Sequence, residues 1–198
     1  MSAREIILAR LRAALDPAPA PVEVPRDYRR DGPADLDRLV DRLTDYRARV
    51  HRVAEAAVAD TITGILPTGA TVVVPPALPP AWLPATVTAL PDDDLDNKQI
   101  AAADGVITAA AVAIADTGTV VLDGSPDQGR RVLSLLPDLH ICVVRAAQVV
   151  ANVPQALTRL APHRPLTWIS GPSATSDIEL NRVEGVHGPR TLHVILLP

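Results

Sequence analysis

The chain has 198 residues and a formal net charge of −4, and its 19 basic residues are scattered along the sequence instead of forming a stripe. This length suits one domain, or one domain with an extra arm, in which about 70% of the surface of the unfolded chain is buried. An acidic protein with scattered cations offers no footprint for a phosphate backbone, which argues against nucleic acid binding.

The core must be built mainly from aliphatic side chains, because the sequence contains no Phe, two Trp and two Tyr. Runs of Val and Ile suit a sheet that is buried on both faces. This composition favours the α/β class.

A single cysteine, Cys142, lies inside the apolar run 139–144, where a thiol is expected to be a small buried hydrophobic group. One cysteine cannot hold an iron–sulfur cluster or a structural zinc ion, so we expect no cofactor on this chain and any redox centre on a partner. No signal peptide and no apolar run of about 18 residues is evident, which predicts a cytoplasmic protein without a membrane span.

In chain order, the first predicted element is an amphipathic helix over residues 5–15, with Ile and Leu side chains at helical spacing. It ends at the proline-rich stretch 16–21, which favours an extended polyproline II conformation. We interpret residues 1–33 as an arm and linker for docking on this subunit or on another one, and residues 34–198 as one α/β domain.

A long helix is predicted next, over about residues 35–62, because apolar side chains recur there with a seven-residue period. Two packings of this apolar seam stay open. It packs on the sheet of its own chain, or against the same helix of a second copy in a homo-oligomer.

After Gly69, short apolar strands alternate with helical stretches. The predicted strands are 71–74, 85–89, 104–108, 112–114, 119–122, 140–144, 166–169 and 192–197, and the predicted helices are 96–103, 126–136 and 153–160. This alternation predicts a mainly parallel sheet flanked by helices, with a hairpin around residues 106–122.

The first candidate ligand loop comprises residues 115–119 and 123–131. Residues 125–128 (SPDQ) match a helix capping box, and the requirements of a helix start alone explain that pattern. Glycines and a helix start near Arg130 and Arg131 would also cradle a phosphate or carboxylate. The candidate ligand-binding residues are Thr117, Gly118, Thr119, Ser125, Gln128, Gly129 and Arg130, and Asp116 is a candidate acid/base.

The second candidate loop is residues 169–180 (ISGPSATSDIEL), where a strand is expected to open into a helix. Open α/β sheets often bind ligands at such a place. Ser176 and Glu179 match a capping box, yet the loop carries more hydroxyls and carboxylates than a helix start needs. The candidate ligand-binding residues here are Gly171, Ser173, Thr175, Ser176, Asp177 and the nearby His187, and Glu179 is a second candidate acid/base.

Several common site types are absent from the sequence. It has no G-x-G-x-x-G or G-x-S-x-G motif, and the segment 64–70 lacks the lysine of a P-loop. No second histidine lies at helical metal-ligand spacing from His187, and the acidic run 92–94 is typical of a solvated loop. We therefore expect no metal site.

Four segments, which follow one another in family order, together resemble the LUD domain family, specifically its lactate utilization protein C group. They are 115–122 (ADTGTVVL), 128–137 (QGRRVLSLLP), 171–179 (GPSATSDIE) and 185–190 (GVHGPR). The arm at 8–15 (LARLRAAL) is also similar to the family, so the likeness covers nearly the whole chain.

The resemblance implies a fold similar to the NagB, RpiA and CoA-transferase group, which includes the folate cyclo-ligases. It also implies a role in bacterial oxidation of L-lactate to pyruvate, with separate iron–sulfur proteins as partners that carry the redox centres. The single cysteine agrees with that division of labour.

Two hypotheses about function stay open. In the first, the chain is a non-redox component of a lactate-oxidising system; in the second, it is a stand-alone enzyme acting on a carboxylate, nucleotide or folate-like molecule. In the enzymatic version, N–H groups after Gly118 and Ser125 would hold a small anionic ligand, with Asp116 or Glu179 as acid/base.

Overall fold

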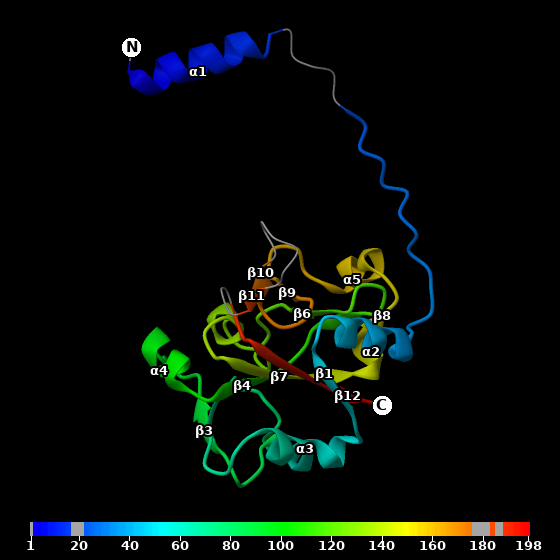
Figure 1. Ribbon diagram of the computed structural model, residues 1–198. Helices are drawn as coiled ribbons and strands as arrows, with labels where there is room; N and C mark the ends of the chain where they lie inside the picture. Colours follow the sequence, from blue (N-terminus) through cyan, green and yellow to red (C-terminus); the bar gives the residue numbers. More distant parts are fainter. Residues whose placement is uncertain (1, 17–21, 176–182, 185–187) are drawn as a thin grey trace.

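A computed structural model describes residues 2–16, 22–175, 183–184 and 188–198. Its centre is a six-stranded sheet in the order β1-β12-β7-β4-β2-β3, and every neighbouring pair is parallel (Figure 1). The strands are β1 (Arg49–Arg52), β2 (Thr71–Val74), β3 (Thr88–Pro91), β4 (Gly105–Ala109), β7 (Leu139–Arg145) and β12 (Thr191–Leu197). The predicted α/β class with a mainly parallel sheet is thus confirmed.

A smaller mixed sheet has the order β8-β5-β6-β9, with β5 and β6 forming an antiparallel hairpin. Its strands are β5 (Val112–Ile114), β6 (Thr119–Leu122), β8 (Val149–Val150) and β9 (Thr167–Ile169). The predicted hairpin is therefore shorter than residues 106–122, because β4 pairs within the large sheet and only β5 and β6 fold back on each other.

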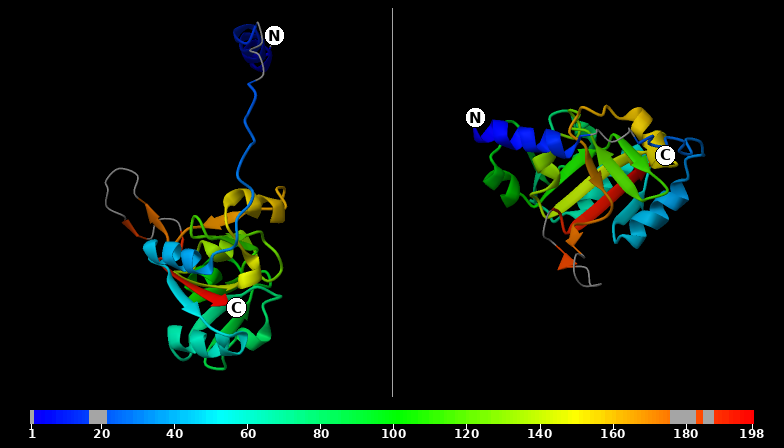
Figure 2. Two further views of the ribbon diagram at one scale, coloured as in Figure 1. Left: turned by 90° about the vertical axis from the view of Figure 1, so that its right-hand side faces the viewer. Right: turned by 90° about the horizontal axis from the view of Figure 1, so that it is seen from above.

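Two aliphatic cores cover the two faces of the large sheet. On one face, Leu39 and Leu43 of α2 (Leu36–Asp45) pack with Val120 and Val194. On the other face, side chains of α3 (Val58–Ile65) pack with those of β4, β7 and β12, Ile195 among them. Figure 2 (left) shows α2 and α3 on opposite sides of β12. The adjacent Val194 and Ile195 point to opposite faces, as the period of a strand requires.

The single long helix predicted over residues 35–62 is wrong. The helix α2 ends at Asp45, Arg47 takes a left-handed φ of 67°, and the chain then enters β1 before α3 begins. The seven-residue pattern did not distinguish these elements, because Leu39 and Leu43 satisfy it in a helix and Val50 satisfies it in a strand. Pairing of β1 with the parallel strand β12 decides the local structure here.

Two other predicted elements differ. The strand predicted at 85–89 lies at Thr88–Pro91, and the helix predicted at 126–136 is a turn followed by a short 3₁₀ helix at Arg131–Ser134. Gly129 has φ of 74°, outside the helical region, so a continuous helix cannot pass through it. The helices α4 (Asn97–Ala102) and α5 (Val153–Arg159) lie within the ranges predicted for them.

The arm forms the helix α1 (Ala3–Ala14) (Figure 1). It begins with a capping box between Ser2 and Glu5, and none of its side chains is buried. Further along, the linker docks on α5, where side-chain amides of Asn152 and Gln155 donate to the carbonyl oxygens of Asp31 and Gly32 at 3.3 and 3.0 Å. A two-stranded antiparallel ribbon, β10 (Ala174–Thr175) and β11 (Val183–Glu184), completes the described fold. Among the described helices, none has the length and apolarity to cross a bilayer.

Candidate functional site

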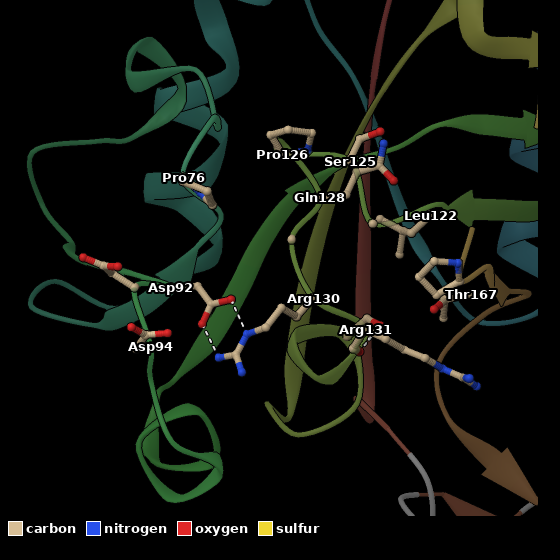
Figure 3. Close-up of a pocket in the computed structure, with 15 residues that line it drawn as sticks. Pro76, Asp92, Asp94, Leu122, Ser125, Pro126, Gln128, Arg130, Arg131 and Thr167 are labelled. Carbon is tan, nitrogen blue, oxygen red and sulfur yellow. Dashed lines mark hydrogen bonds and ion pairs between the residues drawn. The ribbon is translucent and has the colours of Figure 1, made fainter. Parts of the chain in front are cut away.

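The larger candidate site is a cavity of about 510 Å³ at the carboxyl ends of β2 and β3, next to the turn that follows β6 (Figure 3). Parallel sheets commonly bind ligands at this end of their strands. The side chains that matter below come from the acidic loop after β3 and from the turn after β6; they are Asp92, Asp94, Ser125, Gln128, Arg130 and Arg131.

Arg130 is engaged by the protein itself. Its guanidinium forms two hydrogen bonds with the carboxylate of Asp92, one of them from Nε to Oδ2 at 2.8 Å, and a third with the carbonyl oxygen of Leu95 at 2.9 Å. The Asp92 side chain is only 3% exposed, so Arg130 neutralises a nearly buried charge. The hydrogen bonds from Arg130 to Asp92 raise the pKa of the guanidinium and keep it charged. Arg130 therefore joins two loops of the cavity wall.

Residues 125–128 do not form the predicted capping box but a hydrogen-bonded turn. The side-chain oxygen of Gln128 accepts from the backbone N–H of Asp123 at 2.7 Å, and the Asp123 carboxylate accepts from the N–H of Ser125 at 3.1 Å. Asp123 also pairs with Arg164 at 3.1 Å. These bonds hold a compact turn in which Gln128 is buried, so the turn is a rigid wall of the cavity.

Arg131 extends away from Arg130, toward the side of the cavity where Thr167 lies (Figure 3). Within the described part of the chain, no ion pair or side-chain hydrogen bond of its guanidinium is found. It is thus the cation at this cavity that a ligand could use. The sequence placed both arginines beside this loop and predicted Arg130 as the ligand-binding residue, whereas the structure leaves Arg131 as the available one.

The predicted acid Asp116 lies at the opposite end of β6 from Ser125. Its carboxylate pairs with Arg29 of the linker at 3.2 Å and with Arg38 of α2 at 3.1 Å. Because β6 separates the two loops, the structure does not bring Asp116 and the 125–131 turn together. In this structure Asp116 ties the linker to the domain.

Close packing explains two predicted ligand-binding glycines. A Cβ at Gly118 would lie 2.6 Å from Cβ of Arg42, and a Cβ at Gly171 would lie 2.7 Å from the carbonyl oxygen of Tyr46. Both glycines therefore let a loop approach the C-terminal part of α2. Thr117 and Thr119 lie beside them, and the Thr119 hydroxyl is 2.8 Å from those of Thr117 and Ser170.

A second cavity, of about 280 Å³, adjoins the first and shares Ser134 and Thr167 with it. Gly171 and Ser173 line it, as does His140 of β7. The predicted residue Thr175 lies in β10. The other predicted residues, Ser176, Asp177, Glu179 and His187, lie outside the described residues.

His140 was missed by sequence reasoning, since it is surrounded in sequence by apolar residues and reads as part of the core. It is 1% exposed, and its Nε2 lies 2.8 Å from the Thr108 hydroxyl. Burial lowers the pKa of His140 to about 4, so the ring is neutral at pH 7. The neighbouring Cys142 is buried as predicted, and burial raises the pKa of its thiol to about 12. Cys142 is therefore protonated and unreactive.

In the part of the chain that the structure describes, no three or more His, Cys, Asp or Glu side chains gather in a group that could hold a metal ion. The two cavities offer one free guanidinium, the carboxylates of Asp93 and Asp94, several hydroxyls and one neutral imidazole. Groups of this kind are able to bind and orient a ligand by charge and hydrogen bonds.

Comparison with known proteins agrees with the fold and the sequence motifs. The family model for the LUD domain matches residues 36–197. Lactate utilization protein C of Deinococcus radiodurans is 45% identical over 189 residues, which cover 93% of this chain and 86% of that protein. Lactate utilization protein C of Bacillus subtilis is 37% identical over 99 residues, covering 46% of this chain and 41% of the relative.

A solved structure, that of a DUF162 family protein from Deinococcus radiodurans, superposes with a TM-score of 0.73 and 40% sequence identity, covering 82% of this chain and 96% of that one. The fold defines an α/β domain with a cavity at the carboxyl ends of its parallel strands and, among the described residues, no group of side chains that could hold a metal ion. The chain belongs to the LUD domain family, and it is a homologue of the lactate utilization C proteins.

Proposed function

We propose that the chain is a component of a bacterial system that oxidises L-lactate to pyruvate, and that it acts with iron–sulfur partner proteins. The observation that carries this proposal is the 45% identity to lactate utilization protein C of Deinococcus radiodurans over 93% of the chain. Oxidation of lactate releases two electrons, which need an acceptor. The only cysteine is buried and protonated, which supports placing iron–sulfur clusters on the partners.

Within that system, the chain contributes a binding site for a small anionic ligand beside Arg131. The support is a cation without a protein partner among the described residues, at the edge of a cavity of about 510 Å³. Cavities of roughly this size hold small organic ligands. Asp93 and Asp94 are exposed on the wall of the acidic loop, so an anionic group is favoured at the Arg131 side and a hydrogen-bond donor at the other.

Growth on lactate tests the proposal. A strain that lacks the gene is expected to fail on L-lactate as its carbon source, and the intact gene is expected to restore growth. Arg131→Ala should not restore it, while the folded protein accumulates normally. The matched control is Arg30→Ala, because Arg30 is an exposed arginine of the linker that does not line this cavity. Normal growth of the deletion strain would overturn the proposal.

Partnership has its own test. An affinity-tagged copy of the chain, purified from cells growing on lactate, should carry along cysteine-rich proteins whose visible absorption reports iron–sulfur clusters. The same purification from cells grown without lactate is the control. Recovery of the tagged chain alone in both cases contradicts the partner proposal.

The acid/base role of Asp116 and Glu179 is a separate proposal with a separate test. Asp116→Asn and Glu179→Gln keep the size of each side chain and remove its charge. Loss of lactate-dependent growth in a folded variant supports the role, and full growth with both variants excludes it. Arg29→Ala distinguishes the two explanations for Asp116, because it breaks the linker contact and leaves the carboxylate in place.

A stand-alone enzyme acting on a carboxylate, nucleotide or folate-like molecule is the second candidate, favoured by the two adjoining cavities. Thermal unfolding in the presence of nucleotides, CoA esters and folates tests it. A ligand at a hundred times its dissociation constant adds about 2.7 kcal/mol to the free energy of unfolding, which such a measurement detects. Stabilisation by one of these molecules, together with no partner recovery, favours the enzyme.

A further inference from the structure

The two cavities share Ser134 and Thr167 in their linings, which places them side by side. Their chemistry differs. The larger cavity offers the charged Arg131, while the smaller one carries several hydroxyls and His140 among apolar side chains such as Trp168 and Leu192. This inference rests on the anion site proposed above and concerns the part of the ligand that lies beyond its charged group.

Only one of the two ring nitrogens of His140 has a hydrogen-bond partner among the described residues. Nε2 lies 2.8 Å from the Thr108 hydroxyl, whereas Nδ1 has no hydrogen bond within the described part of the chain. The residue is 1% exposed and lines the smaller cavity. No buried side-chain nitrogen or oxygen among the described residues lacks a hydrogen-bond partner, so the unbonded Nδ1 keeps some accessible surface, where a ligand or water can bond to it.

The neutral ring has no charge with which to attract an anion. A hydroxyl group fits it under either tautomer, because a hydroxyl both donates and accepts, whereas a carboxylate or phosphate oxygen only accepts. The Ser134 hydroxyl donates to the carbonyl oxygen of Arg131 at 3.0 Å, which leaves its oxygen able to accept from a ligand. The smaller cavity therefore suits hydroxyl groups.

We propose that the two cavities together bind a polyhydroxylated organic anion, with its charged group at Arg131 and a hydroxyl group on Nδ1 of His140. The shared chemistry admits two sources of the charge, a carboxylate or a phosphate ester. In both cases the smaller cavity recognises a hydroxyl group of the ligand.

Two matched pairs of probes test the proposal by calorimetric titration of the full chain. Gluconate and hexanoate are carboxylates of equal chain length, and glycerol 3-phosphate and propyl phosphate are three-carbon phosphate esters; each pair differs in hydroxyl groups. In at least one pair, the hydroxylated probe should bind about five- to tenfold more tightly than its partner, as one or two net hydrogen bonds provide. The pair that shows the difference identifies the source of the charge.

His140→Gln should reduce that preference to less than about twofold. Arg131→Ala should weaken both members of the pair. If His140→Gln does not fold, the ¹⁵N resonances of the wild-type ring decide: the Nδ1 resonance of His140 should move on addition of the hydroxylated probe and not on addition of its plain partner.

The titrations distinguish failure of this inference from failure of the anion site. Equal affinities within both pairs, or an unmoved Nδ1 resonance, overturn this inference and leave the anion site intact. Absence of binding by all four probes at 10 mM, roughly the weak end of specific affinities, overturns both the inference and the anion site. The role in lactate growth is judged separately by the deletion strain.

Discussion

Gly118 lies against the backbone of Arg42, so closely that a Cβ on the glycine would be 2.6 Å from Cβ of Arg42 and 2.8 Å from its carbonyl carbon. Gly118 also has a φ of 60°. The hairpin turn between β5 and β6 is thereby packed directly against α2, and Asp116 in the same turn reaches Arg38 of that helix. This contact joins the small sheet to α2, which itself packs on the large sheet.

Gly118→Ala should therefore lower the free energy of unfolding by about 2 to 4 kcal/mol, because it adds a backbone clash to a strained φ. Urea unfolding measures the change. The matched control is Gly64→Ala in α3, where nothing lies within 4 Å of the added Cβ. Alanine favours a helix over glycine by about 1 kcal/mol, so the control should be neutral or stabilising. Equal effects of the two substitutions would contradict the packing role.

The ion pair of Asp92 and Arg130 should respond asymmetrically to substitution. Arg130→Met leaves a carboxylate that is 3% exposed without its cation and should cost about 3 kcal/mol. Asp92→Asn leaves a half-exposed guanidinium that water can solvate, and should cost about 1 kcal/mol.

A double-mutant cycle on this pair should show a coupling of about 1 to 3 kcal/mol. The pair of Asp37 and Arg52 is the control, because the Asp37 side chain is 88% exposed and Asp37→Asn should cost less than about 1 kcal/mol. Additive effects at Asp92 and Arg130 would show that the pair does not stabilise the cavity wall.

Stability should fall as the pH is lowered from about 6.5 to about 4. Burial lowers the pKa values of His140 and His193 to about 4, and it also lowers the pKa of His51, whose Nε2 lies 2.9 Å from Nδ1 of His193. The unfolded state therefore takes up protons in this range that the folded state excludes, and the stabilisation present above pH 6.5 is lost toward pH 4.

Urea unfolding between pH 7.5 and 4.5 measures this dependence. For the fully buried His140, the slope is about 1.4 kcal/mol per pH unit. His140→Gln should reduce the slope by roughly that amount, whereas His163→Gln, at an exposed histidine, should leave it unchanged. An unaltered slope in the His140 variant would be the contrary result.

Removal of residues 1–16 should leave the stability of the domain unchanged within about 0.5 kcal/mol, because no side chain of α1 is buried. If the arm is an interaction element, as its exposed apolar residues predict, the same deletion should reduce the recovery of partner proteins from cells. A large loss of stability would instead show that α1 docks on its own domain.

Much of the fold could be predicted because hydrophobic patterns report local structure. The strands β2, β4, β7 and β12 are runs of aliphatic residues, and each was expected within one or two residues of where it lies. The predictions of secondary structure failed where the local structure depends on pairing with residues distant in the sequence. Residues 49–52 form a strand because β12 offers them backbone hydrogen bonds, and no pattern within residues 35–62 reveals that partner.

The candidate site was less predictable, because a polar residue in a sequence does not show which groups will neutralise it. Asp116 resembled a catalytic acid and is paired with two arginines, one of them 87 positions away. His140 resembled a core residue and lines a cavity.

By itself, the sequence determined the α/β class, the succession of most strands, the amphipathic arm and the membership of the LUD domain family. These depend on side-chain period and on short motifs, which are properties of neighbouring residues. Only the tertiary structure decided that Arg130 is occupied by Asp92, that Arg131 is not held in this way among the described residues, and that His140 faces a cavity. Charge and hydrogen-bond partnership depend on distances in space between residues far apart in the chain.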